Sequence, residues 1–258
     1  MNPLVQPPLF WETFFLIVCR VSTVLMIAPI FGNRSVPVHL KIAFSLLLSL
    51  VLLPLVVPSV TSLPDTMPGY LGLVAREIMI GAVVGFATML LFTALQAAGH
   101  IVGLQMGFSL ANVLNPITAD HASLLDQFYG LLAGLIFLVI NGHHALILAI
   151  ARTFDLVPLN HAGAVLPAAP VLFGWSREIL AIASRISLPV MTALLLADIA
   201  LAVVARSVPQ LNVFVVGMPA KLLIGFGVLV VTLPVAITIM ERTFGGLSDT
   251  TVLLLRGM

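Results

Sequence analysis

Charge is what this sequence has least of. Of its 258 residues, 11 are Lys or Arg and 10 are Asp or Glu, so the charged share is 8% and the formal net charge is +1. A protein that binds nucleic acid needs clustered Lys and Arg to neutralise phosphates, and the sequence has no such cluster. The composition therefore argues against nucleic acid as a partner, and the charge pattern points to no other charged ligand.

Cysteine and catalytic motifs are also scarce. Cys19 is the only cysteine, which excludes an intrachain disulfide and a multi-cysteine metal site. No Ser-His-Asp set, glycine-rich phosphate loop or pair of catalytic carboxylates stands out. His143-His144 follows Asn141, but no acidic residue completes a zinc site of the HEXXH type. We therefore expect no enzyme activity, no catalytic residue, no metal and no cofactor.

Apolar residues make up 60% of the chain, and the mean hydropathy is +1.19. A soluble domain of this length would have too little polar surface, so the surplus apolar faces must meet lipid or other subunits. No strand-like alternation is long enough to suggest a barrel, whereas several apolar runs reach the roughly 20 residues that cross a bilayer. The sequence predicts an all-α, integral membrane-type protein with about six hydrophobic helical segments, some broken or bent.

Proline, glycine and polar clusters set the limits of these segments. The predicted helical segments are 11–30, 40–57 with a break at Pro54, 71–102, 124–150 with a pause at 141–144, 176–205 and 221–242. The third is longer than one membrane crossing requires. Residues 159–174, rich in Ala, Pro and Gly, form the longest linker and separate an N-terminal part, 1–158, from a C-terminal part, 175–258. The last two helices are predicted to form an antiparallel hairpin, and the orientation of the termini stays open.

Several apolar runs contain a charged residue, which is costly in hydrocarbon and must face protein, water or the interface. We expect Arg20, Arg76 and Glu77 to turn toward protein neighbours. Asp126 and Asp198 suggest a transporter's proton relay, but pairing with arginines is favoured; the available ones are Arg152, Arg177, Arg185 and Arg206. A secondary transporter would also need two repeated halves around a site at the membrane midplane. The sequence Arg-Glu-Ile occurs at both 76–78 and 177–179, but this repeat is too short to establish such halves.

Glycines recur at every fourth residue in three places, namely Gly81 and Gly85, Gly130 and Gly134, and the series Gly99, Gly103 and Gly107. Small residues at this spacing allow two helix backbones to approach closely in membrane proteins. The third series leads directly into a polar stretch, 105–121, which we interpret as a loop rather than a span. The glycines therefore predict tight helix packing.

Five short motifs follow one another along almost the whole chain. They are Pro29-Ile30-Phe31-Gly32-Asn33-Arg34-Ser35-Val36-Pro37 with Lys41, Arg76-Glu77 with Gly81 and Gly85, Gln105-Met106-Gly107-Phe108-Ser109, Asn141-Gly142-His143, and the run from Pro209 to Pro219. Together these motifs resemble the FliR/SctT family of type III export-gate proteins. Each motif is short, but their order and the matching length make the resemblance specific.

The resemblance implies a structural subunit of a helically wound, multi-subunit export gate that forms and closes a conduit for unfolded substrates. The implied partners are FliP-like, FliQ-like and FlhB-like subunits, membrane lipid and exported flagellar proteins in transit. The implied location is the bacterial inner membrane, in the flagellar basal body, with part of the assembly on the periplasmic side. Residues 1–158 would be FliP-like and residues 175–258 FliQ-like. The alternatives are a virulence-system (SctT-like) gate subunit, a secondary transporter and a scaffold without a conduit.

The family's pore plug would fall on residues 105–120, where Met and Phe side chains can fill a dry constriction. The residues assigned to the plug are Gln105, Met106, Gly107, Phe108, Ser109, Leu110, Asn112, Asn115 and Pro116. Asn115 stands where an acidic residue is common in the family, and a plain connection between helices is the alternative. The residues assigned to assembly and helix packing are Arg20, Arg34, Pro37, Lys41, Arg76, Glu77, Gly81, Gly85, Pro209, Gln210, Asn212, Phe214, Gly217 and Pro219.

Overall fold

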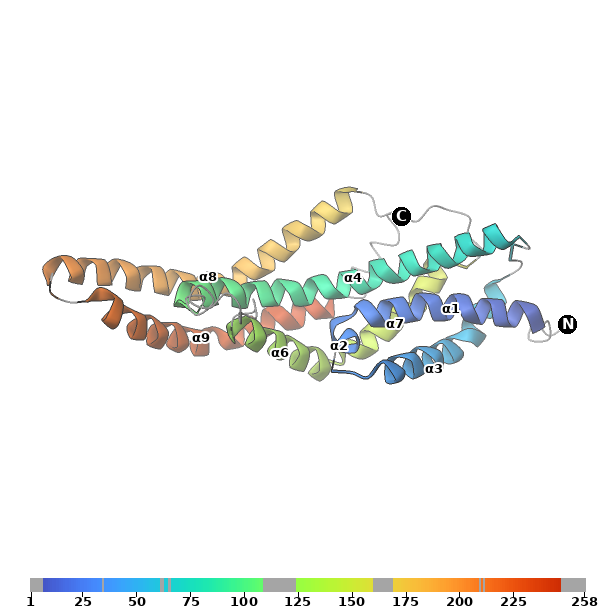
Figure 1. The fold of residues 1–258 in the computed structure, drawn as a ribbon, viewed down its shortest axis with the longest axis horizontal. Coiled ribbons are helices and arrows are strands. Elements are labelled where there is room, and N and C mark those ends of the chain that lie inside the picture. Colours follow the sequence, from blue (N-terminus) through green and yellow to red (C-terminus); the bar gives the residue numbers. More distant parts are fainter. Residues whose placement is uncertain are drawn as a thin grey trace. The chain divides into compact units, whose positions relative to one another are not determined.

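A computed structural model describes residues 7–33, 35–60, 63–64, 66–108, 124–159, 169–208, 210 and 212–246 (Figure 1). Across these residues every regular element is a helix, which confirms the all-α prediction. The elements are α1 (Pro7–Ile27), α2 (Pro29–Gly32), α3 (Val38–Val56), the 3-10 helix η2 (Val57–Ser59), α4 (Met67–Met106), α6 (Leu124–Val139), α7 (Gly142–Leu156), α8 (Ala169–Ser207) and α9 (Val213–Gly245).

Five of the described helices are long and apolar enough to cross a membrane, and α6 with α7 makes a sixth if that broken pair crosses as one span. This agrees with the predicted count of about six hydrophobic segments. Asn141, at the break between α6 and α7, has a φ of 58°, the left-handed conformation that Asn tolerates better than most residues. The 40 residues of α4 extend over about 60 Å. That is twice the roughly 30 Å hydrocarbon core, so a single straight crossing does not hold all of α4 in lipid.

Some predicted helix limits are wrong. α8 begins at Ala169, inside the predicted linker. α9 begins at Val213, eight residues before the predicted start at 221, so Gly217 and Pro219 lie within it. Pro54 likewise lies within α3, and the short helix α2 (Pro29–Gly32) crosses the predicted end of the first segment at residue 30. A proline removes only one backbone hydrogen bond, and an apolar environment favours keeping all the others. Helices in this protein therefore continue through several proline and glycine residues at which the sequence predicted that they end.

The first of two compact units comprises Met1–Leu90, Asn141–Trp175 and Gly245–Met258. Within it, α1 and α4 run parallel, because Tyr70 Oη donates to the carbonyl oxygen of Glu12 at 3.1 Å while Gly81 and Gly85 lie further along, beside 20–27. A Cβ atom at Gly81 would stand 2.6 Å from the carbonyl oxygen of Arg20. Only glycine permits this approach of the two backbones.

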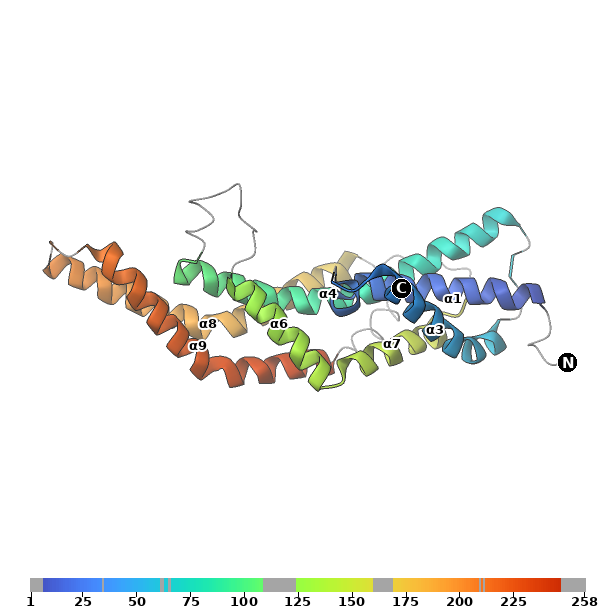
Figure 2. The same ribbon diagram turned by 60° about the horizontal axis from the view of Figure 1, so that its bottom comes forward.

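The second unit comprises Leu91–Ile140 and Ser176–Phe244. The last part of α4 packs antiparallel to α6, with Gly99 against the carbonyl oxygen of Leu125. Phe92, Phe137 and Phe244 form an aromatic cluster with ring centroids 5.0–5.6 Å apart, which joins α4, α6 and α9. Figure 2 shows α8 and α9 side by side, as the hairpin prediction requires.

The α8–α9 hairpin is the least covered part of the described chain. In the apolar 18-residue window of each helix, 11% of the residues of α8 and 17% of those of α9 are buried within the chain, against 50% of those of α4. Large side chains such as Leu196, Leu223 and Val231 are exposed by 62–77%. These faces need lipid or other subunits to remove them from water. Each compact unit contains segments from both the N-terminal and the C-terminal part of the chain. The division into 1–158 and 175–258 stays a prediction.

Candidate functional site

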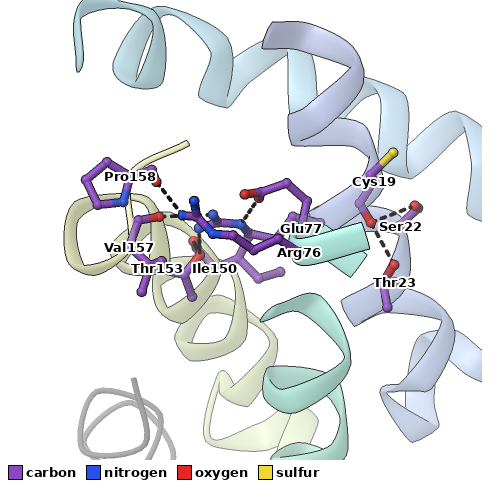
Figure 3. A network of polar contacts seen from close by, with 10 residues as sticks. Cys19, Ser22, Thr23, Arg76, Glu77, Ile150, Thr153, Val157 and Pro158 are labelled. Atoms are coloured by element: carbon purple, nitrogen blue, oxygen red, sulfur yellow. Dashed lines mark hydrogen bonds and ion pairs between the residues drawn. The ribbon is translucent and has the colours of Figure 1, made fainter. Parts of the chain in front are cut away.

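Arg20 is the centre of a buried polar network in the first unit, and Figure 3 labels its partners Glu77, Thr153 and Val157. Its side chain has no exposed surface, and its Nε donates to Glu77 Oε2 at 2.5 Å. Nη1 donates to Thr153 Oγ1 and Nη2 to the carbonyl oxygen of Val157, both at 3.0 Å. The guanidinium also lies 4.1 Å from the ring centre of Phe154. One side chain therefore joins α1, α4 and the end of α7.

Arg76 brings a second cation to this network. Its Nη2 donates to the carbonyl oxygen of Pro158 at 2.6 Å, whereas its Nε and Nη1 are buried without a hydrogen-bond partner in the described chain. Glu77 Oε1 is also buried without one. The network thus holds two guanidinium groups and one carboxylate. The expectation that these three residues turn toward protein is met, although their pairing was not foreseen.

Asp198 and Asp126, in the second unit, each meet a side chain other than the predicted arginines. Lys221 Nζ forms an ion pair with Asp198 Oδ1 at 2.6 Å, and Gln105 Nε2 donates to Asp198 Oδ2 at 3.4 Å. His100 Nδ1 lies 3.1 Å from Asp126 Oδ2. The prediction of arginine partners was wrong because a side chain of the facing helix, not the nearest arginine in sequence, meets each carboxylate.

The hairpin register contains a signal that sequence reasoning missed. Asp198 lies nine residues before the end of α8, and Lys221 lies eight residues after the start of α9. In an antiparallel pair, residues at equal distances from the turn face each other. A predicted helix start at Val213 instead of residue 221 would have placed Asp198 and Lys221 at nearly equal distances from the turn, and so would have predicted their ion pair.

The first residues of the predicted plug lie at the end of α4, so the prediction of a loop from Gln105 was wrong by two residues. Gly107 has a φ of 90°. The N–H of Gly107 donates to the carbonyl oxygen of Leu104 at 3.1 Å, and that of Phe108 to Gly103 at 3.0 Å. These two bonds define a Schellman helix stop, which glycine favours because it alone adopts this backbone conformation freely.

Met106 and Phe108 both contact α9. Met106 has no exposed surface, and its Cε, Sδ and Cγ lie 2.7–2.9 Å from where a Cβ atom of Gly225 would be. The absence of a side chain at Gly225 creates the space that Met106 fills. Phe108 packs edge to face with Phe226, at a centroid distance of 6.1 Å. These contacts position the start of the 105–120 segment against α9.

The other predicted site residues fall into two groups. Ser109, Leu110, Asn112, Asn115, Pro116, Arg34 and Pro209 lie outside the described residues, and Phe214 is described only by its helical backbone. Of the remainder, Pro37 immediately precedes α3, and Gln210 lies between α8 and α9. Lys41 Nζ donates to the carbonyl oxygen of Gly32 at 3.0 Å and to that of Asn33 at 2.8 Å. Asn212 immediately precedes α9, and its Oδ1 accepts from the N–H of Val215 at 3.4 Å. Within α9, Gly217 is buried and Pro219 is exposed.

An open cavity of about 410 Å³, lined by polar and apolar side chains, lies between α4 and α6. The lining residues of α4 are Thr93, Gln96, Ala97, His100 and Ile101, and those of α6 are Asp126 and Gln127. The described residues contain no group of three or more His, Cys, Asp or Glu placed to hold a metal ion. The ring centroids of His143 and His144 lie 4.2 Å apart at the start of α7, and the ring planes are tilted by 41° to each other.

The chain resembles proteins of known family over nearly its full length. The model of the family "Bacterial export proteins, family 1" matches residues 11–247. The flagellar biosynthetic protein FliR of Bacillus subtilis is 32% identical over 95% of this chain and 93% of its own length. FliR of Escherichia coli is 31% identical, covering 90% and 88%, and FliR of Caulobacter vibrioides is 28% identical, covering 84% and 87%. These matches confirm the resemblance seen in the five motifs: the chain belongs to the bacterial export proteins, family 1.

Proposed function

We propose that this chain is a structural subunit of the export gate of the flagellar type III secretion system. Together with other subunits it forms and closes a conduit for unfolded substrates, and it has no catalytic role. The observation that carries the proposal is the family match over residues 11–247. The relatives named above are flagellar proteins, which favours a flagellar over a virulence system.

The proposed partners are FliP-like, FliQ-like and FlhB-like subunits in the bacterial inner membrane, at the flagellar basal body, with part of the assembly on the periplasmic side. The sparse burial of α8 and α9 supports this, because apolar faces of that extent need cover. Residues 1–158 take the FliP-like position and residues 175–258 the FliQ-like position. Membrane lipid covers the faces that the partners leave.

In this proposal the 105–120 segment closes the conduit. The described residues support an abrupt end of α4 at Gly107, from which the segment departs. Met106 and Phe108 then serve as its anchor on α9 rather than as the seal itself, because their side chains already pack against Gly225 and Phe226. The seal is left to residues further along the segment.

Deleting the gene for this chain tests the proposed function. Flagellar hook and filament subunits are expected to disappear from the culture medium while their cytoplasmic levels persist, and the full chain supplied in trans is expected to restore export. Secretion through the general export pathway, measured in the same cells, is the control. Undiminished release of flagellar subunits from the deletion strain would overturn the proposal.

A further inference from the structure

A small apolar cavity with one lysine in its lining lies in the first unit, where α1 and α3 pack against each other and α2 lies in the turn that joins them (Figure 1). Its volume is about 180 Å³, and its lining residues are Leu25, Phe31, Val36, Leu40, Lys41 and Phe44. The rings of Phe31 and Phe44 stack with centroids 5.4 Å apart and planes within 9° of parallel. An apolar cavity of about 150 Å³ accommodates a hydrocarbon as large as benzene, so this one has room for part of a lipid chain.

Lys41 is the one charged residue of this lining. Its Nζ donates to the carbonyl oxygens of Gly32 and Asn33 at 3.0 and 2.8 Å. These bonds use two of the three donors of the ammonium group, and because carbonyls are neutral they leave its unit charge in place. Within the described chain, Lys41 takes part in none of the ion pairs. The cavity therefore combines an apolar lining with a positive charge that lacks a counter-charge among the described residues.

The surrounding sequence is basic. Between Glu12 and Asp65 there is no acidic residue, and the Lys and Arg residues of this stretch are Arg20, Arg34 and Lys41. Glu12 stands about 20 Å farther along α1 than Leu25, too far to compensate Lys41. Glu77, from α4, is already paired with Arg20. The charge of the cavity is thus complementary to an anion from outside the chain.

The rest of α3 has the character of a lipid-facing helix. Its 19 residues extend over about 28 Å, close to the roughly 30 Å of hydrocarbon in a bilayer. After Lys41, the exposed residues of α3 are all apolar, namely Ile42, Ala43, Leu46, Leu47, Leu50, Val51, Pro54 and Leu55. Before it, the exposed residues include the polar Asn33, Ser35 and His39. This change places Lys41 at the boundary between hydrocarbon and the headgroup layer, where lipid phosphates lie.

We infer that the cavity and Lys41 form a binding site for an anionic phospholipid. The phosphate lies against Lys41 Nζ, and the first part of an acyl chain enters the cavity beside Phe31 and Phe44. An acidic side chain of a partner subunit would bury an ion pair here and lose its hydration, whereas a lipid phosphate in the headgroup layer keeps its contact with water. The inference goes beyond the proposed export role, and it requires only that the chain lies in a membrane.

The test measures lipid binding to the detergent-solubilised complex that contains this chain. The delipidated complex is titrated with phosphatidylglycerol, or with phosphatidylcholine of the same acyl chains, and bound lipids are counted by native mass spectrometry. Lys41→Gln is expected to weaken phosphatidylglycerol binding about fivefold, the contribution of one basic group near a membrane surface, and Lys41→Arg to retain it. Lys221→Gln is the matched control, because it removes the only other lysine, which is paired with Asp198, and is expected to change nothing.

A second pair of variants tests the cavity without changing the charge. Val36→Phe fills the cavity and is expected to weaken phosphatidylglycerol binding severalfold, whereas Leu47→Phe, at a position on α3 that is 63% exposed and outside the lining, is expected to leave it unchanged. Each variant is first checked for incorporation into the complex and for export of flagellar subunits, which separates failure of this site from failure of the proposed function. If Lys41→Gln does not enter the complex, the comparison of Val36→Phe with Leu47→Phe decides.

Three results would overturn the lipid site and leave the export function intact. The first is equal affinity of the unaltered complex for the two lipids. The second is an equal effect of the two variants in either matched pair, Lys41→Gln with Lys221→Gln or Val36→Phe with Leu47→Phe. The third is a complex without lipid at this site in which Leu40→Cys cross-links to a partner subunit, because the cavity would then be a contact between subunits.

Discussion

Glu77→Gln is expected to destabilise the assembled protein strongly, because it removes one charge of a pair that is wholly buried. Neither Arg20 nor Glu77 has an exposed side chain. The amide keeps the shape of the carboxylate, while Arg20 keeps its bonds to Thr153 and Val157 and loses its counter-charge. Removing one partner of a buried ion pair costs about 3–5 kcal/mol. Arg76, with two buried donors unpaired in the described structure, adds to the excess positive charge.

Asp198→Asn is the matched control. It makes the same carboxylate-to-amide change in the Lys221–Asp198 ion pair, which with Arg20–Glu77 is one of the two pairs of a carboxylate with Lys or Arg in the described part of the chain. The side chains of Lys221 and Asp198 are 24% and 34% exposed. Partly exposed pairs contribute about 0–1 kcal/mol. A double variant, Arg20→Met with Glu77→Leu, is expected to be more stable than Glu77→Gln alone, because replacing both charges by apolar groups removes the uncompensated one.

The measurement is the temperature at which half of the tagged chain leaves the detergent-solubilised complex. For a chain of this size, a loss of 3–5 kcal/mol corresponds to a fall on the order of 10 °C. Asp198→Asn is expected to shift it by a few degrees at most. Equal small shifts for Glu77→Gln and Asp198→Asn would refute the reasoning, because burial would then make no difference to the cost.

Three further substitutions test close packing and capping by the same heating assay. Gly81→Ala is expected to cost about 1–3 kcal/mol because its Cβ meets a backbone carbonyl at 2.6 Å, whereas Gly72→Ala on the same helix, with no atom within 4 Å, is expected to be tolerated; equal effects would remove the packing argument. Gly225→Ala is expected to displace the buried methionine at the end of α4 and lower stability relative to Gly227→Ala, whose surroundings are open, and no difference would show that the space is not needed. Asn212→Leu is expected to cost about 1 kcal/mol by removing the cap of α9, and Asn212→Ser to cost little; a loss with Ser as large as with Leu would contradict a capping role.

The helical fold was predictable because its main signal is local. Runs of about 20 apolar residues indicate membrane-type helices whatever their neighbours are, and the break at Asn141 carried a Gly-His-His signature in the sequence. Helix limits were less predictable where Pro and Gly lie within helices, as at Pro219. The cost of one missing backbone hydrogen bond is set by tertiary surroundings, which the sequence does not display.

The sequence predicted which residues belong to the candidate site, but not which of them contact one another. Arg20 and Glu77 were identified as charges in need of neighbours, yet they are 57 residues apart, and no spacing rule links residues on different helices. Met106 was assigned to a pore for its adaptable side chain, and the structure instead places it against Gly225. A glycine that makes room for a distant side chain has no local signature, because the pair exists only after the helices have packed.

The central claim, that this chain works as one subunit of a multi-subunit export gate, is tested most directly by isolating it from its own membranes. A tagged chain, solubilised in mild detergent and separated by size, is analysed by mass spectrometry for its mass and its companions. The account predicts a stable complex that contains FliP-like and FliQ-like subunits in fixed proportion, because α8 and α9 leave most of their apolar surface uncovered. A well-folded monomer that associates with neither kind of subunit would contradict it.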